Sequence, residues 1–152
     1  ASELIAAGVD GSRIYDQLYR KNHPDSAQVL AEALRRHRLR LDGRLAQVSI
    51  DKHLLERAAR ADFDTDAVLD PLRSIEGVEV VALLKERFDG TVKCSLRARG
   101  NVDVQAIVQT FGGGGHKKAA GATMSMPLPE AEAAIEAAVQ RALAEAGAET
   151  RS

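Results

Sequence analysis

One short segment of the sequence has a composition typical of anion binding. Residues 112–121 read Gly-Gly-Gly-Gly-His-Lys-Lys-Ala-Ala-Gly. Four successive glycines are unfavourable inside a packed helix or strand, because glycine loses more conformational entropy on folding than alanine does. They are useful where the backbone bends through positive φ or must approach a ligand without an intervening side chain. The residues that we expect to contact phosphate here are Gly112, Gly113, Gly114, Gly115, His116 and Lys117.

The residues around the glycines exclude two common kinds of phosphate-binding motif. A helical turn beginning near His116 would add free backbone N–H groups and the positive end of a helix dipole. The segment is not a Walker A loop, because no Gly-Lys-Ser/Thr follows, and it is not a dinucleotide-binding fingerprint, because no predicted strand immediately precedes it. Glycine-rich motifs give many false positives, so a flexible loop between a helix and a strand remains the alternative interpretation.

A predicted β-hairpin supplies further candidate residues. Asp89-Gly90 is a strong signal for a two-residue turn, which would pair Phe88 with Thr91. On that register Glu86 neutralises Lys93, while Arg97 and Arg99 face small or apolar partners and have no carboxylate opposite them. Such arginines can bind a phosphate or a carboxylate, although an edge strand kept soluble by its charges is the alternative. The two strands are expected over 78–88 and 91–99.

The remaining sequence predicts an α+β fold. Helical periodicity runs through the first part of the chain, is interrupted at His23-Pro24, and resumes to an end at Asp42-Gly43. Further strands are expected over 44–50 and 122–126, and further helices over 51–60, 103–111 and 130–146. We therefore expect a mixed β-sheet flanked by helices, with a boundary between a helical segment, 1–41, and an α+β domain, 42–152.

Composition excludes several classes of protein. The chain has 152 residues, of which 45% are hydrophobic and 28% are charged, and its formal net charge is −1. This balance argues against a disordered chain and against a uniformly basic nucleic-acid coat protein. No apolar run is long enough to span a membrane, and the single cysteine, Cys94, fits a reducing compartment. We therefore expect a cytoplasmic protein with no membrane partner.

The residues indicate binding chemistry without catalytic chemistry. Asp62, Asp64 and Asp66 imitate the start of a calcium loop, but Ala67 and Arg73 stand where that loop needs glycine and glutamate. The four histidines are scattered, without a second ligand at metal spacing. The sequence shows neither a nucleophile elbow nor a Cys-His arrangement. We therefore predict no catalytic and no metal-ligating residue in this chain.

The candidate residues also resemble a known family. Segment 112–121 is similar to the glycine-histidine motif of the DHHA1 domain of DHH-type phosphoesterases. Segments 72–80 and 92–104 resemble the stretches around the hairpin in the branch of bacterial nanoRNases and pAp phosphatases. Segment 2–41 resembles the closing helices of that branch's catalytic DHH domain and the connector beyond them, as would be left by a truncated domain.

The resemblance implies a division of labour between two domains. In the family, the DHH domain holds two metal ions, typically Mn²⁺ (or Mg²⁺), and hydrolyses a phosphoester, while the DHHA1 domain binds the nucleotide across a cleft. Carried over to this sequence, the glycines and His116 would contact phosphate and sugar, and Arg97 and Arg99 would hold phosphate or stack on a base. The metal-binding DHH motifs are absent from the sequence. We therefore expect no cofactor in this chain and no hydrolysis by this chain alone.

These implications lead to one expected function and two alternatives. We expect a substrate-binding domain of a cytoplasmic phosphoesterase acting on short RNA, pAp or a cyclic dinucleotide. Its partner would be the DHH catalytic domain of the full-length protein, and an isolated fragment could form a homodimer through the face that this domain would cover. The alternatives are a stand-alone nucleotide-binding or regulatory module and a structural domain whose glycines only turn the chain.

Overall fold

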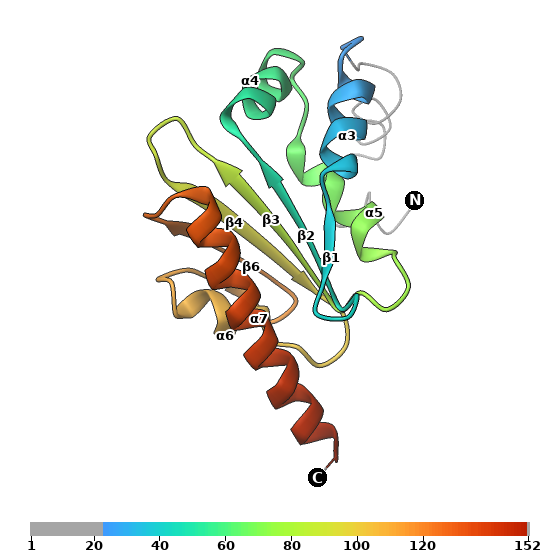
Figure 1. Ribbon diagram of the computed structural model, residues 1–152, viewed down its shortest axis with the longest axis vertical. Helices are drawn as coiled ribbons and strands as arrows, with labels where there is room; N and C mark the ends of the chain where they lie inside the picture. The colour runs from blue at the N-terminus through green and yellow to red at the C-terminus, as the bar shows by residue number, and fades with distance from the viewer. Residues whose placement is uncertain (1–22, 152) are drawn as a thin grey trace, which may run out of the picture.

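A mixed β-sheet forms the centre of the molecule (Figure 1). The computed structural model describes residues 23–151, in which six strands follow the order β1-β2-β3-β4-β6-β5. β2 and β3 are parallel, and every other neighbouring pair is antiparallel. The strands are β1 (Arg38–Arg40), β2 (Leu45–Ile50), β3 (Val80–Glu86), β4 (Val92–Ala98), β5 (Gly114–His116) and β6 (Ala119–Met124). The expected α+β class with a mixed sheet is confirmed.

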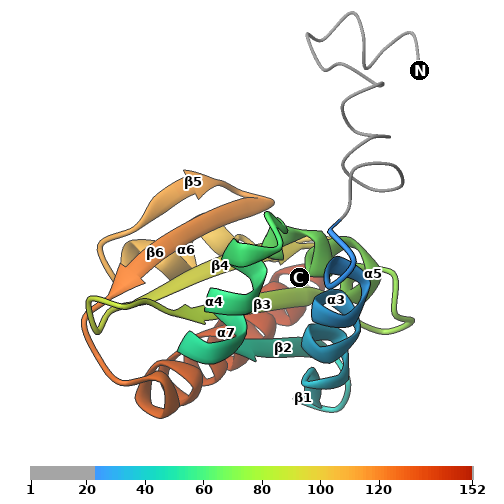
Figure 2. The same ribbon diagram turned by 90° about the horizontal axis from the view of Figure 1, so that it is seen from above.

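Helices cover the two faces of the sheet to different extents. One face is covered over β2 and β3 by α3 (Ser26–Arg35), α4 (Lys52–Arg60), the 3-10 turn η2 (Thr65–Val68) and α5 (Leu69–Arg73). The other face carries α6 (Val104–Gln109), which packs on β6, and α7 (Leu128–Arg151), which packs on β2 and β3. Figure 2 shows β5 and β6 at the end of the sheet farthest from β1 and α3.

Side-chain alternation along β3 creates a hydrophobic core on each face. Val80, Ala82 and Leu84 belong to the core under α6 and α7. Val81 and Leu83 belong to the core under α3, α4 and α5. All five are fully buried, as the continuous apolar run of a central strand requires. β3 is therefore the strand on which both helical layers are built.

The chain before β2 departs from the predicted continuous helix. α3 ends at Arg35, and 38–40 form an edge strand paired with β2. Leu41 and Asp42 adopt φ values of 55° and 56°, so the chain turns tightly before β2. The prediction was wrong because charged residues with helical spacing also suit a short edge strand, where charge opposes aggregation. The helix expected before His23-Pro24 lies outside the described residues.

The structure does not separate the two predicted segments in space. Residues of α3 share one hydrophobic core with residues of α4, α5, β2 and β3. β1 belongs to the same sheet as the strands that follow it. The domain boundary between 41 and 42 stays a prediction.

The hairpin between β3 and β4 is present, but its loop has three residues. The N–H of Arg87 donates to the carbonyl of Thr91 (2.8 Å). Gly90 adopts a φ of 86°, and the Asp89 carboxylate accepts hydrogen bonds from both the N–H and the hydroxyl of Thr91. These bonds favour a three-residue loop with glycine in the left-handed position. The predicted pairing of Phe88 with Thr91 was therefore wrong.

The resulting shift of one residue changes what the arginines face. Arg97 lies opposite Val81 instead of Ala82. The N–H of Arg99 donates to the carbonyl of Glu79 (2.8 Å), whose carboxylate forms an ion pair with Arg44. The expectation that Arg99 has no carboxylate opposite it was wrong, whereas Arg97 still faces an apolar residue.

β5 packs against β6 at a distance that excludes side chains. A Cβ added to Gly115 would lie 2.6 Å from the Cα of Ala120. A Cβ added to Gly113 would lie 2.2 Å from the carbonyl oxygen of Gly121. A Cβ on Gly114, in contrast, would meet nothing within 4 Å. Packing therefore requires glycine at 113 and 115 but leaves open space at 114.

An ion-pair network joins α3 to the start of α4. Glu32 accepts hydrogen bonds from Arg35 and Arg36, and Arg36 also donates to Asp51 (2.9 Å). Asp51 caps α4 by accepting from the N–H of Leu54. The hydrogen bond from Arg35, followed by that from Arg36, lowers the pKa of Glu32 to about 2. The charged form of Glu32 therefore stabilises the folded state.

We predict that Gly115→Ala destabilises the fold. Gly115 has a φ of 143° and no room for a Cβ, so alanine must displace β5 from β6. The expected loss is about 2 kcal/mol or more in the free energy of unfolding, measured by urea denaturation. Gly114→Ala is the matched control and should unfold close to the wild type. Equal stability of the two variants would contradict the packing role of Gly115.

We also predict that Glu32 contributes to the acid sensitivity of the fold. Its pKa is lower in the folded than in the unfolded state, so its stabilisation is complete above about pH 4.5 and is lost as the pH falls towards 2. Glu32→Gln should lower the Tm at neutral pH and flatten the decline over this range, measured by circular dichroism. Glu56→Gln, which breaks an exposed pair with Arg60 on α4, is the control. A Glu32→Gln profile parallel to that of the wild type would be the contrary result.

Candidate functional site

Alternation along β4 gives that strand one apolar and one polar face. Cys94 and Leu96 are buried in the core under α6 and α7, so the residues between them point to the opposite face. On that opposite face α5 packs less on β4 than on β3. The neighbouring residues of β5 and β6 on this face have short side chains or none, except His116. We call this surface the open face; its residues are Lys93, Ser95, Arg97, Gly114, His116, Ala119, Gly121 and Thr123.

One row across the open face brings Arg97 and His116 together. Arg97 pairs with Ala119 across β4 and β6, and Ala119 pairs with His116 across β6 and β5. Two strand spacings place the Cα atoms of Arg97 and His116 about 10 Å apart on the same face. Only the methyl group of Ala119 stands between them. The guanidinium and the imidazole can therefore reach one ligand above Ala119.

Arg97 has no competing anion. Its guanidinium donates to the carbonyl of Leu96 (3.0 Å), and no carboxylate in residues 23–151 forms an ion pair with it. A guanidinium has five N–H donors, so most of its hydrogen-bonding capacity remains available. Arg97 is therefore suited to bind an oxyanion that arrives from solvent.

The glycine segment forms a strand and a turn, so the condition of a helical turn beginning near His116 is not met. β5 ends at His116, and Lys117-Lys118 turn the chain directly into β6. The site therefore has no helix dipole. Three hydrogen bonds to α6 hold the segment: Gln105 Nε2 to the carbonyl of Gly115 (2.8 Å), Val104 N to the carbonyl of Lys117 (2.9 Å) and Gly113 N to the carbonyl of Val108 (2.9 Å).

The other predicted residues take different places. Gly114 is exposed and offers bare backbone to the open face. Gly112 has a φ of 78° and starts the turn into β5, and Lys117 is exposed at the tip of the next turn. Arg99 lies beyond the end of β4, where its guanidinium donates to the carbonyl of Arg73 in α5 (3.1 Å). The structure thus brings Arg97, Gly114 and His116 together and holds Arg99 at the margin.

Sequence reasoning did not select three polar residues of the open face, Lys93, Ser95 and Thr123, as site residues. Lys93 pairs with Thr123 across β4 and β6, and Ser95 lies between Lys93 and Arg97. The alternation of polar residues along β4 was a usable signal. The wrong hairpin register, however, placed Glu86 opposite Lys93 and so assigned its charge to a cross-strand pair. In the structure the residue opposite Lys93 is Lys85.

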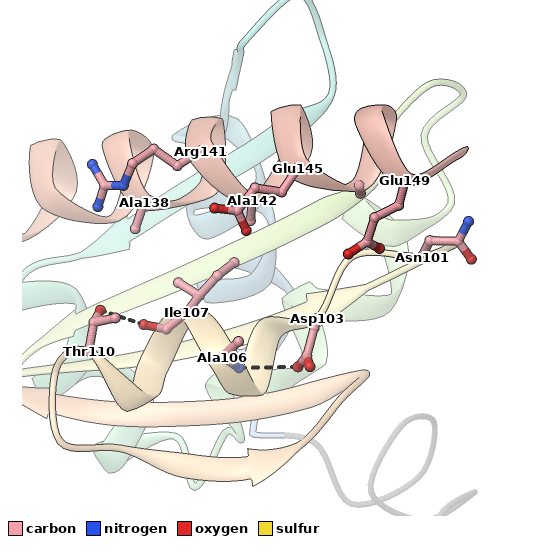
Figure 3. A pocket seen from close by; sticks show the side chains of 11 residues that line it. Asn101, Asp103, Ala106, Ile107, Thr110, Ala138, Arg141, Ala142, Glu145 and Glu149 are labelled. Atoms are coloured by element: carbon pink, nitrogen blue, oxygen red, sulfur yellow. Dashed lines mark hydrogen bonds between the residues drawn. The ribbon is translucent and has the colours of Figure 1, made fainter. Parts of the chain in front are cut away.

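A separate pocket lies on the other side of the sheet, between α6 and α7 (Figure 3). Its volume is about 180 Å³, and its charged lining consists of Asp103, Arg141, Glu145 and Glu149. Three carboxylates against one guanidinium give a negative potential, which disfavours a phosphate. The open face is therefore the better candidate for an anionic ligand.

The described residues contain few other reactive groups. No cluster of three or more His, Cys, Asp or Glu side chains within 23–151 could hold a metal ion. Burial raises the pKa of the Cys94 thiol to about 12, so it stays protonated and unreactive. None of the helices in this part of the chain is long and apolar enough to cross a membrane.

Comparisons of sequence with known proteins support the resemblance. Residues 45–146 match the DHHA1 domain. The chain is 34% identical over 148 residues to the bifunctional oligoribonuclease and PAP phosphatase NrnA of Thermus thermophilus, covering 97% of this chain and 44% of that protein. It is also 34% identical over 102 residues to the cyclic-di-AMP phosphodiesterase GdpP of Geobacillus thermodenitrificans, covering 62% of this chain and 16% of that protein.

Solved structures share the fold. An exopolyphosphatase-related protein from Bacteroides fragilis aligns with a TM-score of 0.71 and 25% identity, covering 92% of this chain and 41% of that one. The pGpG-specific phosphodiesterase PggH from Vibrio cholerae aligns with a TM-score of 0.54 and 14% identity, covering 84% and 41%. The chain spans less than half the length of these relatives. It belongs to the DHHA1 domain family of DHH phosphoesterases, in the branch that contains nanoRNases and pAp phosphatases.

Proposed function

We propose that this chain is the nucleotide-binding part of a metal-dependent DHH phosphoesterase that acts on short RNA, pAp or a cyclic dinucleotide. The observation that carries the proposal is the row formed by Arg97, Ala119 and His116, in which an arginine and a histidine flank a methyl group on the open face. Two similar proteins are named as enzymes that cleave nucleotide phosphoesters, which supports this class of ligand.

Arg97, His116 and Gly114 each have a distinct task under this proposal. Arg97 would bind a phosphate with two parallel N–H donors and neutralise part of its charge. His116 would donate from its ring to the phosphate or the sugar. The bare backbone of Gly114 lets the ligand approach the sheet. Together these contacts would orient the scissile bond, and correct orientation is itself a large part of catalysis.

Hydrolysis would be carried out by the DHH domain. That domain would supply Mn²⁺ or Mg²⁺, which lowers the pKa of a bound water. No group of three or more His, Cys, Asp or Glu side chains within residues 23–151 could hold such an ion. That this chain contributes no catalytic residue stays a prediction. The partner in this proposal is the DHH domain of the full-length, cytoplasmic protein.

We predict that the chain binds pAp through the open face. Arg97→Ala and His116→Ala should each weaken binding about ten-fold, because each removes a hydrogen bond to a charged group. Gly114→Ala should keep its stability but bind more weakly, since its methyl group would occupy the face. The measurement is an NMR titration, which detects weak complexes.

Arg141→Ala is the control for this titration, because it removes one positive charge from α7 on the other side of the sheet. It should bind pAp as the wild type does. If Arg97→Ala and His116→Ala also bind like the wild type, the site is wrongly assigned.

We further predict that the purified chain releases no phosphate from pAp in the presence of Mn²⁺. The physical reason is that the described residues offer no site where a metal could activate water next to the ligand. The measurement is a phosphate-release assay, with a protein of this family that contains both domains as the positive control. Mn²⁺-dependent turnover by this chain would show that the chemistry does not need the DHH domain.

A further inference from the structure

Two lysines face each other across β3 and β4, at the end of the open face near the hairpin. Lys85 and Lys93 are direct cross-strand partners, an arrangement of like charges that destabilises a sheet. The ammonium of Lys85 lies 3.6 Å from Asp66 Oδ1 and is partly neutralised. Lys93 forms no ion pair and no hydrogen bond from its ammonium with any residue in 23–151. This end of the open face therefore holds a cation that the fold leaves uncompensated.

Two hydroxyl groups lie beside Lys93. Thr123 is its exposed partner on β6. Ser95 is only 7% exposed, yet its hydroxyl makes no hydrogen bond within the described part of the chain. The Ser95 oxygen is not among the fully buried atoms that lack a partner, so it keeps contact with solvent and can bond to a ligand that arrives from solvent. Its partner on β6 is Gly121, which has no side chain to cover it.

The cluster of Lys93, Ser95 and Thr123 is separate from the row of Arg97 and His116. Lys93 and Arg97 are four residues apart on β4, which corresponds to about 13 Å. Side chains of a strand stand roughly perpendicular to the sheet, and the hydrogen bond to the carbonyl of Leu96 holds the Arg97 guanidinium close to its own strand. A phosphate bound above Ala119, between Arg97 and His116, therefore lies two rows away from Lys93 and Thr123 on this face.

We propose that Lys93, Ser95 and Thr123 form a second phosphate-binding point of the open face. This inference rests on the proposed function, which places a first phosphate at Arg97 and His116. The ammonium supplies charge, and the two hydroxyls donate hydrogen bonds to the same oxyanion. A ligand that uses both points is a short single-stranded oligonucleotide lying along β4. A mononucleotide with one phosphate occupies one point only.

The first prediction concerns the effect of Lys93 on the stability of the sheet. Lys93→Gln removes a charge opposite Lys85 and keeps most of the aliphatic stem, so it should unfold at the same temperature as the wild type or higher. If Lys93 instead stabilised the sheet, Lys93→Gln would unfold at a lower temperature than the wild type.

The decisive experiment compares two ligands by NMR titration: AMP, and triadenylate with a 5′-phosphate. The wild type should bind the trinucleotide more tightly than AMP. Lys93→Gln should weaken the trinucleotide about ten-fold and leave AMP unchanged. The plot of log K against log salt concentration for the trinucleotide should become less steep by about 0.7, the value for one phosphate contact on a single strand. Ser95→Ala should weaken the trinucleotide in the same selective way.

The control variant is again Arg141→Ala, which should leave both affinities and the salt dependence unchanged. Equal weakening of AMP and trinucleotide by Lys93→Gln would overturn the second binding point, since it would reflect general electrostatics. Unchanged trinucleotide binding in Lys93→Gln, or a wild type that does not prefer the trinucleotide, would also overturn it while leaving the proposed function standing. A wild type that binds neither ligand would overturn the proposed function and this inference together.

Discussion

The close packing of β5 on β6 is the constraint on which the candidate site depends. Side chains at Gly113 and Gly115 would collide with β6, so only a strand without them can approach so closely. This approach places His116 in the same row as Arg97, two strands away. The glycine motif therefore has two separable tasks. Gly113 and Gly115 permit the packing, and Gly114 leaves the open-face side of the strand bare.

The position of the open face follows from the polarity of single strands. β3 is apolar on both faces, so helices pack on both of its sides. β4 is apolar only on the side of Cys94 and Leu96. A helix packed over Ser95 and Arg97 would bury polar groups without partners, which is unfavourable. The polar side of β4, on which helices pack less than they do on β3, is thus the candidate side for binding an anion.

Sequence patterns predicted the fold class, but not the pairing between strands. Periodicity was sufficient for β2, the hairpin and α7, because their hydrophobic residues repeat regularly. The hairpin register depends on the φ of Gly90 and on hydrogen bonds to Asp89, and an Asp-Gly pair is compatible with loops of two or three residues. β1 exists only because β2 lies beside it, so its own residues could not indicate it. The one-residue shift of the hairpin concealed the pairing of Lys85 with Lys93.

The near-zero net charge does not reveal how the charges are distributed over the molecule. Carboxylates pair with arginines on the helices and at β1, as Glu32 does with Arg36 and Glu136 with Arg40, while Arg97 and Lys93 have no ion-pair partner among residues 23–151. On a face open to water, a cation and a phosphate 4 Å apart attract each other by only about 1 kcal/mol, against about 4 kcal/mol where the effective dielectric constant is near 20. Strong binding to this face therefore requires a second surface that excludes water. A DHH domain across a cleft would provide that surface, so phosphate affinity and assembly of the cleft would be coupled.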